Sequence, residues 1–520
     1  MRLLMAVLCG AVLCAAQTVE TVPAAPRPLD LRVDQLLTQF PAVARGAWGA
    51  YALNLATGDV LYQRDSNHTF VPASNNKLYA TSLALNRLGP DYRFITRVTA
   101  SQLPNAQGLL AGDLILQGGG DPTLSGREYP YRKNAPVSDP LGPLDELAAR
   151  IYESGIRRIT GDIVGDDRAY LHEPFPPGWG EDDTLYDYGA PVSALVLHDN
   201  YLDLRLDAAQ PGELAHLRST PETGYFQVIN RVLSTARGAS HVSYRRTGDG
   251  RVIELSGTVS AASPVSLDVA LDDPARYAAH AFRYLLTRRG ITVDGVARPL
   301  HRTSLDATLP AVPASTTDTI ELARRSSPPL AQIVQVTNKV SQNLYAELLL
   351  RELARVRGKA GSRRAALDEL GTWLRSLGAR NDDFAFSDGS GLSRLDLITP
   401  ETTIRVLKAM YEGPNRDLWL DSLPLGGEDG SLSLRFKGWT GGRVRAKTGT
   451  LTHVTALSGY LDTPAGDLIA FSVMANNANT NAAGIRGFID ALVIALAAPP
   501  GTPSAPQVPR IVGAETASPQ

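Results

Sequence analysis

A serine and a lysine three positions apart, Ser74 and Lys77, constrain the fold of this chain more than any other feature. The two side chains can meet only if a helix begins here, because residues i and i+3 lie on the same face of a helix. Pro72 suits the first turn of such a helix, and apolar or small residues recur near a 3.6-residue period after it. Of the seven lysines, only Lys77 has a serine three positions before it. The pair therefore proposes a serine nucleophile at a helix N-terminus, with an amine beside it.

Length, charge and cysteine content limit the classes of protein that can use such a pair. A chain of 520 residues with 43% hydrophobic and 20% charged residues is typical of a globular protein of about two to four domains. The formal net charge of -2 gives no electrostatic reason to expect nucleic acid or an anionic membrane as a partner. Both cysteines precede residue 17, so the remaining chain has neither a disulfide nor a thiol catalyst.

The first sixteen residues have the pattern of a signal peptide. Met1-Arg2 is a short basic start, Leu3 to Leu13 is an apolar run, and Cys14-Ala15-Ala16 supplies small residues at the usual cleavage spacing. The apolar run is too short to span a bilayer comfortably, and neither cysteine follows the small residue that a lipoprotein signal needs. We therefore expect a signal peptide over residues 1–16, export to the periplasm or extracellular cell-wall space, and no integral membrane segment.

The remaining chain changes character twice. Residues 17–92 mix one helical pattern, one hairpin pattern and the Ser74 helix, and residues 273–497 are mainly helical until three strand patterns near the end. Residues 93–272 carry short β-like runs between Gly, Pro, Asp and Asn clusters, and the tail 498–520 has a disordered, Pro-rich composition. The β-like runs are Phe94–Ala100, Leu114–Gln117, Arg158–Val164, Val192–Leu197, Leu202–Leu206 and Val252–Val259.

Two further motifs carry reactive side chains. Ser341-Gln342-Asn343 lies between two helical patterns, and Lys447-Thr448-Gly449-Thr450 lies on a strand pattern. Each motif alone is weak, because Ser341 and Asn343 could merely cap a helix and Lys447 could be an exposed lysine of an edge strand. In chain order with Ser74 and Lys77, the three motifs are a strong signal of serine acyl-transfer chemistry.

The three motifs resemble the S-x-x-K, S-x-N and K-T-G set of penicillin-binding proteins and serine β-lactamases. Ser341 lies 267 positions after Ser74; compact β-lactamases have a far shorter interval, and the extra length matches the β-rich section. The chain is therefore similar to the class C low-molecular-mass penicillin-binding proteins, the D-alanyl-D-alanine carboxypeptidase/endopeptidases of the penicillin-binding protein 4 type. Gln342 departs from the Asp that is common in this family. Further segments that agree are Gly118–Leu124, Tyr188–Leu195, Asn338-Lys339, Asp388–Arg394 and Asp429–Leu432.

The resemblance implies an α/β fold with a serine β-lactamase/transpeptidase-like domain. Such a domain has an antiparallel sheet flanked by helices and a helical subdomain, and here it would carry a β-rich inserted region. We expect the transpeptidase-like domain to be discontinuous, formed by residues 17–92 and 273–497, with residues 93–272 as the insertion.

The chemistry requires an uncharged Lys77. An ordinary lysine pKa near 10.4 leaves roughly one molecule in 10³ neutral at pH 7, so burial and the second cation Lys447 must lower the pKa of Lys77. Lys77 could then take the proton of the Ser74 hydroxyl. Ser341 is the natural bridge that returns this proton to the leaving amine, and Asn343 can orient Lys77.

The resemblance adds substrate-binding roles. It implies an oxyanion hole formed by the backbone N–H groups of Ser74 and Thr450. The hydroxyls of Thr448 and Thr450, on either side of Gly449 and aided by Lys447, suit the terminal carboxylate of a D-alanine. The implied reaction cleaves D-Ala–D-Ala ends of peptidoglycan peptides through a Ser74 ester, and the implied partners are those peptides and β-lactam antibiotics.

Two other functions fit the same residues. A β-lactamase or esterase on the same fold would deacylate penicillin quickly, and a non-catalytic peptidoglycan-binding protein would keep the shape without the reaction. We expect no metal, because the eight histidines show no H-E-x-x-H or other tight ligand spacing. We also expect no cofactor, because the glycines at 118–120 are not followed by the Gly-Lys-Ser/Thr of a phosphate-binding loop.

Overall fold

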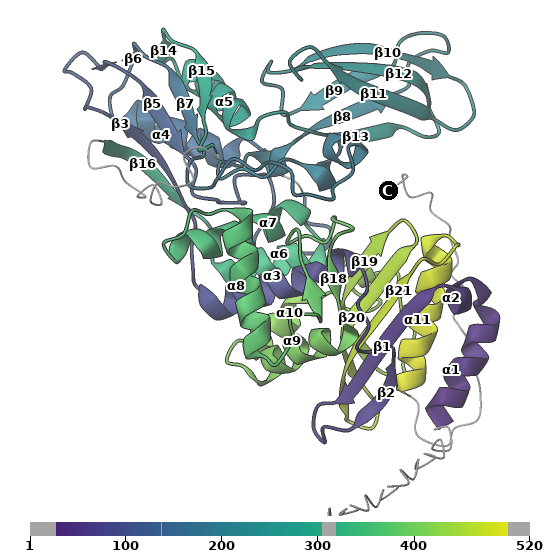
Figure 1. Cartoon of the computed structure of the whole chain (residues 1–520). Helices are drawn as coiled ribbons and strands as arrows, with labels where there is room; N and C mark the ends of the chain where they lie inside the picture. The colour runs from purple at the N-terminus through teal and green to yellow at the C-terminus, as the bar shows by residue number, and fades with distance from the viewer. Residues whose placement is uncertain (1–27, 137, 304–318, 498–520) are drawn as a thin grey trace, which may run out of the picture.

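The computed structural model describes residues 28–136, 138–303 and 319–497 (Figure 1). The predicted signal peptide and the predicted Pro-rich tail lie outside the described residues. In Figure 1 an antiparallel sheet with its covering helices occupies the lower right, a group of helices the centre, and a β-rich region the top. No helix of the described ranges is both long enough and apolar enough to cross a bilayer.

The first sheet has five antiparallel strands in the order β19-β20-β21-β1-β2. Helices α1 and α11 lie on one face and α9 lies on the other. The apolar residues of β20 alternate accordingly: Leu457 and Leu461 pack in the α11 core, whereas Ala456 and Tyr460 pack in the core below α9. The strands are β1 (Ala47–Asn54), β2 (Val60–Arg64), β19 (Arg443–Leu451), β20 (Val454–Asp462) and β21 (Leu468–Asn476); the outer helices are α1 (Pro28–Gln39), α2 (Pro41–Arg45) and α11 (Ala482–Leu496).

The helical part surrounds α3 (Lys77–Arg87), which is buried continuously from Lys77 to Leu85. Helices α6, α7, α8 and α9 all pack against α3, so the helix that follows Ser74 is the centre of this core. A helix buried on all sides holds its N-terminal end rigidly, and the short turn that leads into this end carries Ser74. The surrounding elements are α6 (Leu330–Lys339), α7 (Asn343–Val356), α8 (Arg363–Ser376), α9 (Pro400–Glu412), α10 (Arg416–Ser422), β17 (Phe384–Ala385) and β18 (Leu397–Ile398).

The inserted region holds several small sheets. A five-stranded sheet runs β15-β7-β5-β3-β16, and three-stranded sheets run β14-β6-β4, β13-β8-β9 and β10-β12-β11. The elements are β3 (Ile95–Ala100), β4 (Leu109–Leu110), β5 (Leu114–Gln117), α4 (Gly142–Glu153), β6 (Arg158–Ile159), β7 (Ile163–Asp166), β8 (Tyr201–Asp207), β9 (His216–Thr220), β10 (Gln227–Thr235), β11 (His241–Thr247), β12 (Val252–Ser260), β13 (Val265–Ala270), α5 (Pro274–Arg288), β14 (Thr292–Val293), β15 (Ala297–Leu300) and β16 (Ile320–Ser326).

The strand pairing places the end of this region beyond residue 272, the boundary expected from the sequence. Strand β16 pairs with β3, and α5 packs against β7 and β15, so both belong with the inserted sheets. The helical pattern of α5 resembles that of the helices around α3, and a local pattern cannot show that the strands after α5 return to β3 and β7. We therefore place the return to the transpeptidase-like domain after Ser326.

The β-like run Val192–Leu197 is not a strand. The segment is fully buried, with Val192, Ala194 and Val196 in the core around α3 and Leu195 and Leu197 in the core of the insertion. Its apolar side chains alternate because two cores flank it, and not because it joins a sheet. This segment is one of the connections between the insertion and the helices around α3.

Candidate active site

Ser74 and Lys77 lie one turn apart, and Nζ of Lys77 is 2.8 Å from Oγ of Ser74. The turn is a short 3-10 helix, Ala73–Asn76, and the α-helix begins at Lys77, slightly later than the sequence pattern indicates. The chain enters this turn through Ala73, whose φ of +48° is a sparsely populated conformation for a residue with a side chain. Strain therefore sits directly before the candidate nucleophile.

The amine of Lys77 has three oxygen neighbours. Besides Ser74, its Nζ lies 2.5 Å from Oδ1 of Asn343 and 2.7 Å from the carbonyl oxygen of Ser390. An uncharged amine has two N–H donors and one lone pair. Because the carbonyl and amide oxygens can only accept, they take both N–H groups, and the lone pair is left to accept the Ser74 hydroxyl proton. This arrangement is that of a general base.

Burial favours the uncharged form. Lys77 is completely buried, and burial lowers its pKa to about 7, although Asp388, Glu347 and Asp396 act in the opposite direction. Burial, then the neighbouring carboxylate of Asp388, raises the pKa of Asp396 well above its ordinary value, and burial raises the pKa of Glu347 to about 7. Two of these three acids therefore carry less negative charge than exposed acids would, which limits their stabilisation of a charged Lys77.

Asp388 organises the turn that supplies the Ser390 carbonyl. Its carboxylate accepts hydrogen bonds from the N–H groups of Gly391 (2.7 Å) and Ser393 (2.8 Å) and from Nε1 of Trp179 (2.8 Å). Burial acts to raise the pKa of Asp388, but these hydrogen bonds and one with Asp396 outweigh it and hold the pKa below its usual value. A carboxylate fixed in this way keeps the turn 388–393 rigid beside Lys77.

The second motif meets the third. Nζ of Lys447 lies 2.8 Å from Oγ of Ser341, and Lys447 is completely buried. Burial, and then the charge of Lys77, lowers the pKa of Lys447 well below its ordinary value. Ser341 sits between α6 and α7 with φ of +64°. Ser341 thus has a strained backbone conformation, and its hydroxyl contacts the buried amine of Lys447.

The insertion anchors this loop. Nδ2 of Asn343 donates to the carbonyl oxygen of Tyr188 (2.7 Å), and Nε2 of Gln342 donates to Asp199 (3.2 Å). The Gln342 side chain also accepts from the N–H of Leu344 (3.0 Å) and so caps α7. A glutamine can donate to a carboxylate as well as accept, whereas an aspartate at this position would face Asp199 with like charge. The departure from the common Asp is explained by this partner.

Asp199 is a residue that the sequence patterns did not single out. Its carboxylate is 2% exposed and accepts from Arg127 (2.6 Å) and the Tyr345 hydroxyl (3.0 Å) as well as from Gln342. The sequence offers one signal that could have identified Asp199: three polar residues at 198–200 directly follow a long apolar run. All three have positive φ values.

The third motif lies on β19, at the edge of the first sheet. Nδ2 of Asn75 donates to the carbonyl oxygen of Lys447 (3.0 Å), which ties β19 to the serine turn. A Cβ atom on Gly449 would lie 2.5 Å from the carbonyl oxygen of Pro72, so only glycine permits this approach. Thr448 bonds the hydroxyl of Ser431 (2.7 Å).

Gly449→Ala is expected to push β19 away from the serine turn and to slow acylation by penicillin by about 10²-fold, because displacements near 1 Å have costs of this order. The measurement is the second-order rate constant for acylation. Gly142→Ala is the matched control, since a Cβ there meets nothing within 4 Å. Equal rates for the two variants would contradict the steric argument.

A cavity of about 750 Å³ opens in front of these groups. Ser74, Ser341, Asn343 and Thr450 line it, whereas the amines of Lys77 and Lys447 lie buried behind them. Thr448 and Gly449 are not among the lining residues. The opposite wall comes from the insertion and includes Arg127, Trp179, Asp182, Asp183, Asp187 and Tyr188. The three predicted motifs therefore meet in one cavity that both parts of the molecule build.

A family model described as the D-Ala-D-Ala carboxypeptidase 3 (S13) family matches residues 29–498. The chain belongs to the S13 peptidase family. It is thus a serine-type hydrolase of the D-Ala-D-Ala carboxypeptidase class, and the predicted family resemblance and fold class are confirmed. The S13 peptidase is 34% identical over 486 residues to a D-alanyl-D-alanine carboxypeptidase of Actinomadura sp. (strain R39), covering 91% of this chain and 85% of that protein.

A second relative of the S13 peptidase is D-alanyl-D-alanine carboxypeptidase DacB of Haemophilus influenzae, which is 26% identical over 452 residues and covers 83% of this chain and 86% of that protein. The crystal structure of penicillin binding protein 4 (dacB) from Haemophilus influenzae matches with a TM-score of 0.72 and 23% identity. The match covers 89% of this chain and 97% of that one. That protein has also been solved in complex with a β-lactam.

Proposed function

We propose that Ser74 of this S13 peptidase is the nucleophile that releases the terminal D-alanine from peptidoglycan stem peptides, with Lys77 as its general base. The observation that carries the proposal is the set of contacts at Lys77 Nζ: two acceptors that can only receive N–H bonds, and the Ser74 hydroxyl at 2.8 Å. Ser341 also contacts a buried lysine amine and lines the cavity, so the two strict acceptors on Lys77 and the place of Ser74 directly before α3 distinguish the Ser74 pair.

In the acylation step, Ser74 Oγ attacks the carbonyl carbon of the D-Ala–D-Ala bond while its proton passes to Lys77. Backbone N–H groups of Ser74 and Thr450 would receive the oxyanion. The leaving D-alanine amine needs a proton. The hydroxyl of Ser341, hydrogen-bonded to Lys447, is the group suited to pass it on from Lys77. Water then takes the place of the D-alanine amine, and the steps run in reverse. Water attacks the ester carbonyl, and a proton returns to the oxygen of Ser74, which regenerates the free serine.

The substrate carboxylate would bind at Thr450, which lines the cavity, with Thr448 and Lys447 next to it on β19. The pKa of Lys447 is low in the free protein because burial and Lys77 disfavour its charge. An incoming carboxylate favours the charged form, so binding of the substrate would restore the cation where the negative group lies. We also propose that the chain is exported to the cell-wall space, because export would bring this site to its substrate.

The direct test is release of D-alanine from a pentapeptide ending in D-Ala–D-Ala. We expect the wild-type chain to release one D-alanine from each peptide molecule. It should release no alanine from the same peptide ending in D-Ala–L-Ala. Cross-linked muropeptides incubated in parallel would measure endopeptidase activity. The same preparation should form a long-lived adduct with penicillin.

Other outcomes would identify the alternatives. Rapid turnover of penicillin without D-alanine release would indicate a β-lactamase. Binding of muropeptides with no product of either kind would indicate a non-catalytic peptidoglycan-binding protein.

A further inference from the structure

A second group of chemically active side chains lies in the insertion, away from the serine cavity. Asp167, His172 and His301 each offer a ligand atom, and these atoms lie within 4.8 Å of one another. Two neighbouring parallel strands bring them together: Asp167 directly follows β7, and His301 directly follows β15. His172 is held beside the end of β15, because its backbone N–H donates to the carbonyl oxygen of Arg302 (2.7 Å).

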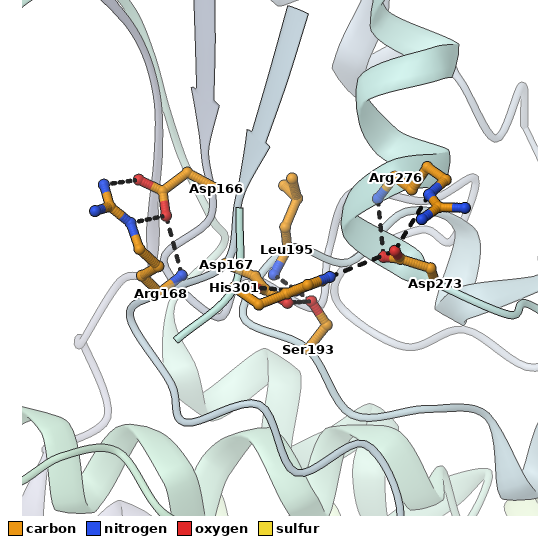
Figure 2. Close-up of polar contacts among 8 residues, drawn as sticks. All are labelled: Asp166, Asp167, Arg168, Ser193, Leu195, Asp273, Arg276 and His301. Carbon is orange, nitrogen blue, oxygen red and sulfur yellow. Dashed lines mark hydrogen bonds and ion pairs between the residues drawn. The ribbon is translucent and has the colours of Figure 1, made fainter. Parts of the chain in front are cut away.

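The contacts around His301 fix the orientation of its ring (Figure 2). Nδ1 lies 2.9 Å from Oδ1 of Asp167, and Nε2 lies 3.4 Å from Oδ2 of Asp273, the residue that caps α5. The His172 ring packs against His301 with the ring centroids 4.1 Å apart and the ring planes tilted by 37°. His301 therefore has a carboxylate on each nitrogen and a second imidazole in contact with its ring.

Asp167 is itself oriented. Its side chain is 3% exposed, and its Oδ2 accepts from the hydroxyl of Ser193 (2.9 Å), which in turn accepts from the N–H of Leu195 (3.1 Å). The adjacent Asp166 turns the other way and pairs with Arg168, as Figure 2 shows. Asp167 thus presents Oδ1 toward His301, and the pair between Asp166 and Arg168 does not neutralise it.

We propose that Asp167, His172 and His301 form a binding site for a divalent transition-metal ion, with Zn²⁺ as the ion that fits best. Two imidazole nitrogens and one carboxylate oxygen form a ligand set that Zn²⁺ commonly takes, with a fourth position for water. Asp273 on the far nitrogen of His301 and Ser193 on Asp167 are outer partners of the kind that orient metal ligands. Nδ1 of His301 faces Asp167, so that nitrogen is the ligand and Nε2–H remains with Asp273.

The place of the site indicates what the ion would do. Glu173, next to His172, pairs with the fully buried Arg351 of α7 (2.8 Å). The segment from Asp167 to Glu173 therefore leads from the inserted sheet to the helices around α3. An ion on Asp167, His172 and His301 would join this segment to the end of β15 and stiffen the connection, without taking part in the reaction at Ser74.

The test uses the full chain without a histidine tag, freed of metal by a chelator and then titrated with ZnCl₂. Calorimetry should show one site per chain, and dialysed protein should retain one equivalent of zinc by mass spectrometry. Co²⁺ in place of Zn²⁺ should give visible d–d absorption. His172→Ala should abolish zinc binding, because it removes one of the three ligands. The variant should keep its fold, since His172 is exposed. Ser193→Ala should weaken zinc binding by about 10–100-fold.

His216→Ala is the matched control, because His216 is an exposed histidine of the insertion outside the cluster, and it should bind zinc like the wild type. Zinc should also raise the melting temperature of the wild type and of the His216 variant, but not that of the His172 variant. Equal zinc retention by the wild type and His172→Ala would overturn the proposal. So would a wild type that retains no zinc.

Discussion

Replacing Ser74 with alanine is expected to remove covalent labelling by penicillin, a loss of at least about 10⁴-fold in acylation. The serine supplies the oxygen of the acyl-enzyme bond, and no neighbouring hydroxyl shares its contact with Lys77 among the described residues. The fold should persist, because the side chain lies at the cavity wall and Lys77 is the one hydrogen-bond partner of its hydroxyl among the described residues. Fluorescent penicillin on a gel and the mass of the intact protein measure the adduct, and a melting curve measures the fold.

Ser82→Ala is the matched control for this experiment. Ser82 lies on the same helix and is completely buried, but its hydroxyl bonds the carbonyl oxygens of Leu78 and Tyr79. This variant should be labelled like the wild type. An adduct that persists in a folded Ser74→Ala protein would place the nucleophile elsewhere.

Replacing Lys77 with methionine should slow acylation by about 10³-fold, within the range that general bases contribute. Methionine keeps the volume of the buried side chain and removes only the amine. The pKa of Lys77 is about 7, so the wild-type amine is charged below that pH and has no lone pair for the Ser74 proton. The wild-type acylation rate should therefore rise with pH through about 7, and the variant should lose this step. Stopped-flow acylation from pH 5 to 9 measures both.

Lys408→Ala, on an exposed lysine of α9, is the control for the Lys77 experiment and should keep both the rate and the pH step. A pH step near 7 that survives in Lys77→Met would assign the base to another group. Glu347, whose pKa is raised to about 7 by burial, would then be the first residue to replace.

The sequence predicted the parts of the site that have a short-range signature. Ser74 and Lys77 follow from helical spacing, and the motifs at Ser341 and Lys447 have recognisable neighbours. The sheet that carries Lys447 was also predictable, because its last three strands are consecutive and a short turn-forming segment joins the last two. The resemblance to a known family then joined the three motifs, which no local pattern could do.

The parts that escaped prediction depend on contacts between distant residues. Asp199 orients Gln342 across 143 positions of the sequence, and nothing near either residue reveals the pair. The boundary after Ser326 depends on β16 returning to β3. Strands β9 and β11 were not predicted because neither has a fully buried residue, so their apolar alternation is weak. The low pKa of Lys77 needs the burial that only the packed helices create.

The pairing of β1 with β21 determines when the enzyme can become active. Every residue from Ala47 to Asn54 pairs with a residue between Ile469 and Asn476. Strand β1 therefore cannot pair with β21 until the ribosome has added more than 400 further residues. Closing such a long loop is costly in chain entropy and slow. The inserted sheets need only residues up to Ser326 and can form beforehand. During synthesis the serine therefore stays without its complete surroundings until almost the entire polypeptide has emerged.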